Sequence, residues 1–259
     1  MAQSVSIGTA WSETSAFVAR EKRLLAPLVL ALMVLPTTVS QLTQPGNPFA
    51  SSDGLRPWMA IGLVALVIGL AGQMAVSRLA MGADRSLGGT IGLALGRLPA
   101  TLGAFILFFL AASLVLIPLI IVMSLVSGGP ASGGVSALTV LVVFALMPRI
   151  LVAPALAMDE RLGPWGLVKA TWAATRGQYW RLLMFFLLFL VASLIFAAAV
   201  SAVVGSLATL ALGRPEPMSV SRLCVALAGG LVQGVVATVY AAMIGRLLLQ
   251  LRRGSNSGM

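Results

Sequence analysis

The sequence predicts an all-α, polytopic membrane protein with six transmembrane helices, and three observations lead to this fold class. The 259 residues are 59% hydrophobic and only 9% charged, whereas a soluble domain carries about 25% charged residues to cover its surface. The apolar residues gather in long runs, and a run of roughly 20 such residues can cross the hydrocarbon of a bilayer. Only short polar links separate the runs, so we expect one membrane domain over residues 1–259.

Six apolar runs are long enough to be spans. Pro36 lies in the first run and is expected to kink that helix or to mark its outer end. Trp58 opens the second run and is placed as an interface anchor. Glycine, proline and serine mark the links 41–57, 127–134 and 213–219 as turns. The expected spans are 24–42, 58–81, 102–126, 135–158, 182–212 and 220–249.

Three further segments mix basic residues with apolar or aromatic ones, at 11–25, 84–99 and 163–181. Such a composition is typical of amphipathic helices that lie in the membrane interface. Residues 1–10 are polar and small, and we expect them to be disordered. The basic residues of 11–25 come too late for a signal peptide, so the first span is expected to stay uncleaved.

The distribution of charge predicts the orientation. Of the 17 basic residues, 14 fall in the terminal segments and in the links 78–98 and 149–181, whereas the opposite links hold only Arg56, Arg214 and Arg222. By the positive-inside rule, both termini and the interfacial helices are therefore cytoplasmic, in a bacterial inner membrane. The formal charge of +10 thus indicates orientation, and we expect no nucleic-acid partner.

Catalytic side chains are scarce. The chain has no histidine and a single cysteine, Cys224, which excludes an intrachain disulfide and removes the commonest general base. Asp159 and Glu160 are adjacent, so on a helix they point about 100° apart rather than forming a pair. We expect no catalytic residues, no metal and no cofactor.

The chain carries a weak threefold internal repeat over residues 12–80, 84–158 and 164–250. Each segment has the order interfacial helix, span, short loop, span and arginine, and the arginines are Arg78, Arg149 and Arg246. Repeats of this kind can define a fold, so pseudo-threefold packing is a further prediction. The three arginines either converge on a phosphate-bearing ligand or anchor their helices to headgroups.

The segment 163–181 is the best interfacial helix. Trp165, Trp172 and Tyr179 recur every seven residues and share a face, with Lys169 and Arg176 beside them. Together with Trp180, these aromatic residues are predicted interface anchors, and the cations are predicted contacts to anionic headgroups. Whether the helix recognises an anionic lipid or only anchors the fold stays open.

Small residues mark two predicted helix-packing faces, because they let helix backbones approach closely. One face lies on the segment 163–181 and the other on the sixth span. The residues are Gly166, Ala170 and Gly177 on the first and Ala226, Gly230 and Gly234 on the second.

The central stretch resembles the membrane domain associated with glycerophosphoryl diester phosphodiesterases. It is similar in an R-x-x-x-A-P-A turn at 149–155, an acidic pair before G-P at 159–164, a T-W-x-x-T-x-G helix at 171–177 and W-R-L-L at 180–183. The opening WSETSAFVAREKRLLAPLVLALMVLP also resembles the bacterial members. The resemblance implies the membrane part alone, because the family's catalytic barrel uses histidines that this chain lacks.

The leading functional hypothesis is a non-enzymatic membrane module that organises partner proteins or lipids, with anionic headgroups as its ligands. One alternative is a carrier or channel for a phosphate-bearing lipid or small anion, built on Arg78, Arg149 and Arg246. A membrane-embedded hydrolase is the third hypothesis. A protein partner or a homo-oligomer stays open.

Overall fold

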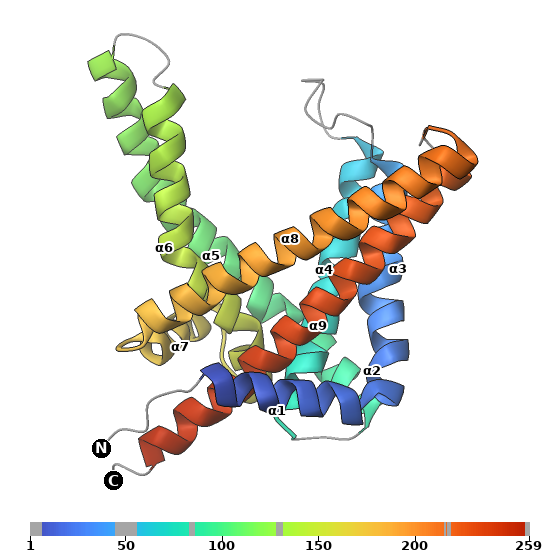
Figure 1. Ribbon diagram of the computed structural model, residues 1–259. Coiled ribbons are helices and arrows are strands. Elements are labelled where there is room, and N and C mark those ends of the chain that lie inside the picture. Colours follow the sequence, from blue (N-terminus) through green and yellow to red (C-terminus); the bar gives the residue numbers. More distant parts are fainter. Residues whose placement is uncertain are drawn as a thin grey trace. The chain divides into compact units, whose positions relative to one another are not determined.

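The computed structural model describes residues 7–44, 56–82, 86–127, 132–214, 216 and 219–256, and the elements within these ranges are all helical (Figure 1). Six of these helices are long and apolar enough to cross a membrane, so the protein is a polytopic all-α membrane protein, as predicted. The spans are Lys22–Thr43, Pro57–Ala80, Leu87–Val122, Thr139–Asp159, Tyr179–Leu212 and Val220–Gln250.

The helices follow the predicted order closely. In chain order they are α1 (Ile7–Arg20), α2 (Lys22–Val29), the π-helix η1 (Leu30–Val34), α3 (Leu35–Thr43), α4 (Pro57–Ala80), α5 (Leu87–Ser127), α6 (Ser132–Asp159), α7 (Pro164–Thr175), α8 (Tyr179–Leu212) and α9 (Val220–Asn256). The predicted disorder of residues 1–6, and the predicted turns at 45–55 and 128–131, lie outside the described residues.

Several boundaries differ from the prediction, and two of these differences change an expected element. Residues 7–10 form the first turn of α1 rather than a disordered tail. The segment 87–99 does not form a separate interfacial helix but is the first part of α5, which runs through Pro99 without a break. No cluster of turn residues follows Pro99, and one proline alone kinks a helix more readily than it ends it.

The chain divides into two compact units. The first unit is made of residues 1–96 and 189–259, and the second is made of residues 97–188. Both α5 and α8 pass from one unit into the other.

In the first unit, the first span contains a π-turn. The Leu35 N–H donates to the Leu30 carbonyl, five residues back, and Pro36 follows at the start of α3. Proline lacks an N–H and its ring crowds the carbonyl four residues before it, so a wider turn ahead of Pro36 accommodates the ring. The span therefore continues beyond Pro36 to Thr43 instead of ending at it.

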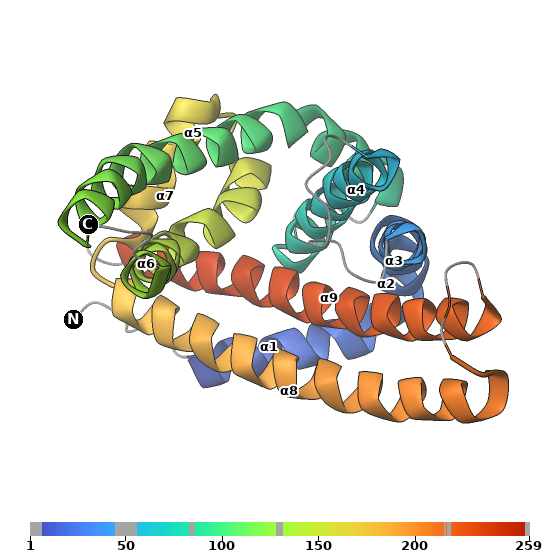
Figure 2. The same cartoon turned by 90° about the horizontal axis from the view of Figure 1, so that it is seen from above.

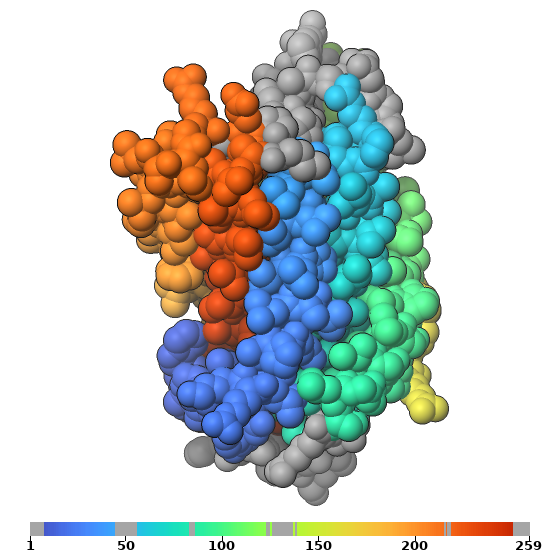
Figure 3. All heavy atoms as spheres, turned by 90° about the vertical axis from the view of Figure 1, so that its right-hand side faces the viewer, coloured from blue at the N-terminus to red at the C-terminus, as the bar shows by residue number. Residues whose placement is uncertain are grey.

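The first span lies against both α4 and α9, as Figure 2 shows, and in Figure 3 its blue surface lies between the cyan α4 and the orange-red α9. Glycines permit this close packing. A Cβ added at Gly72 of α4 would lie 3.1 Å from Leu32 Cβ, and one added at Gly234 of α9 would lie 2.7 Å from Val34 Cγ2. Such small-residue contacts are the usual basis of helix association in a membrane.

Helix α1 packs across α9 in the same unit (Figure 1). Its buried residues Ala10, Thr14 and Phe17 recur at helical spacing and form one face. Phe17 lies beside Arg246, ten residues before the last residue of α9. The first helix of the chain therefore lies at the carboxyl-terminal part of the last helix.

In the second unit, α6 packs on α7. Arg97 of α5 supports the end of α6, because its Nη1 donates to the carbonyls of Ala157 at 2.8 Å and Glu160 at 2.5 Å. The last carbonyls of a helix have no partner within the helix, and a cation there satisfies them. This contact holds the link that leads from α6 into α7.

Candidate functional site

Arg149 of α6 is the centre of the candidate site, in the second unit. Its guanidinium carbon lies 3.4 Å from the centroid of the Trp172 ring and 5.3 Å from that of the Tyr179 ring. Within the described residues Arg149 has no carboxylate at ion-pair distance, and its Nε is buried without a hydrogen-bond partner. The positive charge is therefore stabilised by two aromatic rings, which attract a cation through their negative faces.

Helix α7 places Trp172 against this arginine. Pro164 begins the helix, where its missing N–H costs nothing. Three residues of α7 are buried and hold the helix in the unit, namely Leu167, Thr171 and Thr175. Trp172 follows Thr171 directly, and its side chain is 48% exposed. The ring thus contacts Arg149 while one part of it stays accessible.

A turn between α7 and α8 brings the second ring to the arginine. Gly177 has a φ of +88°, a left-handed conformation that favours glycine. Tyr179 then begins α8, and its hydroxyl donates to the Ala145 carbonyl of α6 at 2.9 Å. Trp180 continues the cluster with an edge-to-face contact to Tyr179, the ring centroids being 5.6 Å apart.

The other predicted cations of this segment lie outside the stack. Lys169 Nζ is 5.5 Å from the centroid of Trp165, which is 61% exposed. Arg176 is exposed in the turn after α7. The structure therefore brings Arg149, Trp172, Tyr179 and Trp180 together, and it places Lys169 with Trp165 as a separate pair.

The structure does not place the small residues of α7 in the predicted packing face. The buried stripe is Leu167, Thr171 and Thr175 instead. A Cβ at Gly166 would meet Leu162, in the link just before α7, and Gly177 is exposed in the turn with open space around it. The prediction assumed one helix over 163–181, but α7 ends at Thr175, so Gly177 is not on its face. Ala170 is half-buried and is not one of the buried stripe residues.

The small residues of α9 do lie at a helix contact. Ala226 is buried. A Cβ at Gly230 would lie 2.5 Å from Thr38 Oγ1 and 3.1 Å from the Val34 carbonyl oxygen. Gly230 and Gly234 therefore face the first span, where a side chain would not fit.

Arg78 and Arg246 belong to the first unit, whereas Arg149 belongs to the second. At the crossing of α4 and α9, a Cβ at Gly245 would lie 2.8 Å from the Ser77 carbonyl oxygen. Arg78 and Arg246 are the next residues along each helix. Convergence of all three arginines, and the threefold packing, stay predictions.

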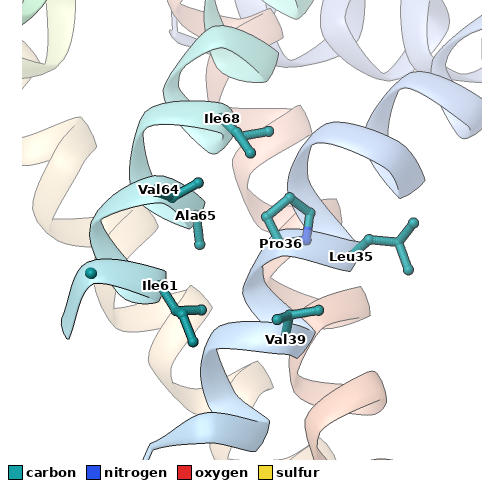
Figure 4. A pocket seen from close by; sticks show the side chains of 8 residues that line it. Leu35, Pro36, Val39, Ile61, Val64, Ala65 and Ile68 are labelled. Atoms are coloured by element: carbon teal, nitrogen blue, oxygen red, sulfur yellow. The ribbon is translucent and has the colours of Figure 1, made fainter. Parts of the chain in front are cut away.

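An apolar groove of about 450 Å³ lies between α3 and α4. Figure 4 shows Ile61, Val64 and Ile68 of α4 pointing toward the turn of α3 that carries Pro36. Its lining residues are all apolar, so this groove offers no polar contact to an anion. Among the described residues, no three histidine, cysteine, aspartate or glutamate side chains gather as they would around a metal.

Comparison with protein-family models, curated proteins and solved structures finds no match. The resemblance to the membrane domain associated with glycerophosphoryl diester phosphodiesterases therefore stays a prediction.

Sequence reasoning missed three contacts. The first is the contact of Phe17 with Arg246. The second is the hydrogen bonding of Arg97 to the end of α6. In the third, Arg222 of α9 donates to the carbonyls of Gln41 and Gln44 at the end of α3. The repeat carried a signal for the first contact, because an aromatic residue stands in the short helix of both the first and third segments. The two carbonyl contacts join residues far apart in sequence and leave no local pattern.

Proposed function

We propose that this chain is a non-enzymatic, multi-pass module of a bacterial inner membrane that holds anionic lipids at its cytoplasmic face. The observation that supports this most strongly is Arg149, a cation within a span, stacked 3.4 Å from Trp172 and without a carboxylate partner in the described residues. A charge within a span is costly unless a partner compensates it. The partner that we propose is the phosphate of a lipid headgroup.

The depth of Arg149 fits that partner. Arg149 lies 17 residues after the start of α6 at Ser132, which is about 25 Å along the helix axis and therefore close to the inner boundary of a hydrocarbon core about 30 Å thick. An arginine side chain that reaches toward the interface from this depth can meet headgroup phosphates. In the orientation that the charge distribution favours, this is the cytoplasmic leaflet, where anionic lipids attract basic residues.

Helix α7 suits the interface in this arrangement. Trp165 and Trp172 are large apolar residues that are 61% and 48% exposed, and the ring of each lies beside a cation. Indole rings prefer the headgroup layer, while lysine and arginine extend toward phosphate. A guanidinium that stacks on an indole by its face can still use the edge of its planar fork for two parallel hydrogen bonds to phosphate oxygens.

Retention of lipid tests the proposal. We expect wild-type protein to keep phosphatidylglycerol through purification in dodecyl maltoside and Arg149→Met to bind it about tenfold less tightly, because one charge-assisted contact contributes at least about 1.4 kcal/mol. Native mass spectrometry with added lipid measures the affinity. Arg161→Met is the matched control, since Arg161 is exposed in the link between α6 and α7.

Equal lipid affinity in the wild type and Arg149→Met would disprove the proposal. Equal losses in Arg149→Met and Arg161→Met would show that only overall charge attracts the lipid.

The motifs at 149–155 and 171–177 further support membership of the resembled family, as its membrane part without a catalytic barrel. In that case the purified chain leaves glycerophosphodiesters intact.

A further inference from the structure

Helices α1 and α9 are in contact in the first unit, and among the described residues these two helices carry three buried polar atoms near this contact that lack hydrogen-bond partners. They are Thr14 Oγ1 of α1 and Arg246 Nε and Gln250 Nε2 of α9, each buried. Most buried polar atoms in proteins are hydrogen-bonded, and an orphaned one points to a missing water or ion. Three of them on two helices in contact point to a shared polar ligand.

The helical spacing places these groups along the contact. Thr14 shares the buried face of α1 with Phe17, three residues later, and Thr14 is only 1% exposed. Arg246 and Gln250 are four residues apart and share a face of α9. The Arg246 guanidinium carbon lies 5.5 Å from the centroid of the Phe17 ring, so the buried face of α1 meets this face of α9.

The charge around this contact is positive. Neither α4 nor α9 contains an acidic residue. Near α1, the described part of the chain has two carboxylates: Glu21 pairs with Arg20 at 3.1 Å, and Glu13 is half-exposed and forms no ion pair with Arg246. The excess charge favours an anion over a neutral water molecule.

We propose that the α1–α9 contact is a second anion site, one that takes a phosphate group. Arg246 Nε and the Gln250 amide donate to phosphate oxygens, and the Thr14 hydroxyl donates to a third. Donors around a shared anion, with an arginine among them, are the usual chemistry of phosphate binding. This inference goes beyond the function proposed above, because it concerns other residues in the other unit.

The phosphate comes either from a lipid headgroup or from free inorganic phosphate, and two arms of one experiment separate these sources. Full-length protein is purified into dodecyl maltoside, a detergent without phosphate. Its thermal unfolding is followed during titration with sodium phosphate, against sodium chloride at equal ionic strength, and separately with phosphatidylglycerol. Stabilisation by the salt identifies free phosphate, and stabilisation by the lipid alone identifies a headgroup.

The variant Thr14→Val/Gln250→Leu removes the two uncharged groups with little change in side-chain size. We expect it to bind the stabilising ligand at least tenfold less tightly than wild type. Ser221→Ala is the matched control, because Ser221 Oγ is also buried without a partner but lies about 40 Å along α9 from Gln250. This control should bind like wild type.

The proposal fails if neither ligand stabilises the wild type, which would leave an ordered water only, or if the double variant binds like Ser221→Ala. The lipid affinity of Arg149→Met is measured in parallel, so that a loss of binding at the Arg149 site can be told apart from a loss at the α1–α9 contact. A loss in Arg149→Met with none in the double variant leaves the proposed function standing and overturns the second site. The opposite pattern retains the second site alone.

Discussion

An arginine meets an aromatic ring of a short helix in each of the two units, but the two contacts differ in what the ring does. In the first unit, Phe17 is 4% exposed and lies 5.5 Å from the Arg246 guanidinium carbon. In the second unit, Trp172 is 48% exposed and lies 3.4 Å from that of Arg149. The phenyl ring is therefore part of a packed interior, whereas the indole mainly holds a cation near the surface of its unit.

Truncating each ring should separate these roles most strongly. We expect Phe17→Ala to lower the free energy of unfolding by about 3–5 kcal/mol, because it empties a buried site. Trp172→Ala should cost under about 2 kcal/mol, because half of the ring is already accessible. Unfolding by titration with sodium dodecyl sulfate in mixed micelles measures both, and similar costs would refute the distinction between a packing ring and a surface ring.

The glycines of the two units offer the next contrast, with effects of opposite sign. Gly230→Ala should destabilise the protein by about 1–3 kcal/mol, since the new Cβ would lie 2.5 Å from Thr38 Oγ1 and 3.1 Å from backbone. Gly166→Ala should stabilise it by about 0.5–1 kcal/mol, because alanine favours a helix and meets only Leu162 at 3.4 Å. The same titration checks both. Destabilisation by Gly166→Ala would restore the packing face that the sequence predicted on α7.

The smallest effect should come from changing the ring type beneath Arg149. Trp172→Phe keeps an apolar ring but weakens the cation–π attraction, which is strongest for tryptophan. We expect a loss of about 0.5–1 kcal/mol in phosphatidylglycerol binding, or two- to fivefold in affinity. Native mass spectrometry with Phe189→Leu as a control can resolve this. An unchanged affinity would show that any apolar ring supports the arginine.

The sequence alone predicts the spans well, because span length and composition are local properties. Pro57 begins α4 and Leu212 ends α8 where the apolar runs begin and end. The spacing of Trp172 and Tyr179 also singled out two residues that meet one arginine, although the chain between them turns instead of forming one helix.

The rest depends on contacts between distant segments. Nothing near Thr14 in the sequence shows that its hydroxyl is enclosed without a partner, because this follows from the approach of α9. The continuous α5 was missed since a proline beside glycines reads equally as a link or as a tolerated kink. The packing face predicted from the small residues of α7 was wrong because the helix ends before the last of them. Residues at helical spacing share a face only while the helix continues.

The π-turn at Leu30–Val34 has a consequence for the register of the first span. It holds one residue more than an α-helical turn, and one residue corresponds to about 100° of rotation. Val34, at the end of the turn, faces Gly234 and Thr38, beyond it, faces Gly230, so both meet α9. Loss of one residue here would hardly shorten the span, yet it would rotate the Thr38 hydroxyl away from Gly230. The number of residues in this turn therefore determines which direction the following side chains face, and has little effect on the length of the span.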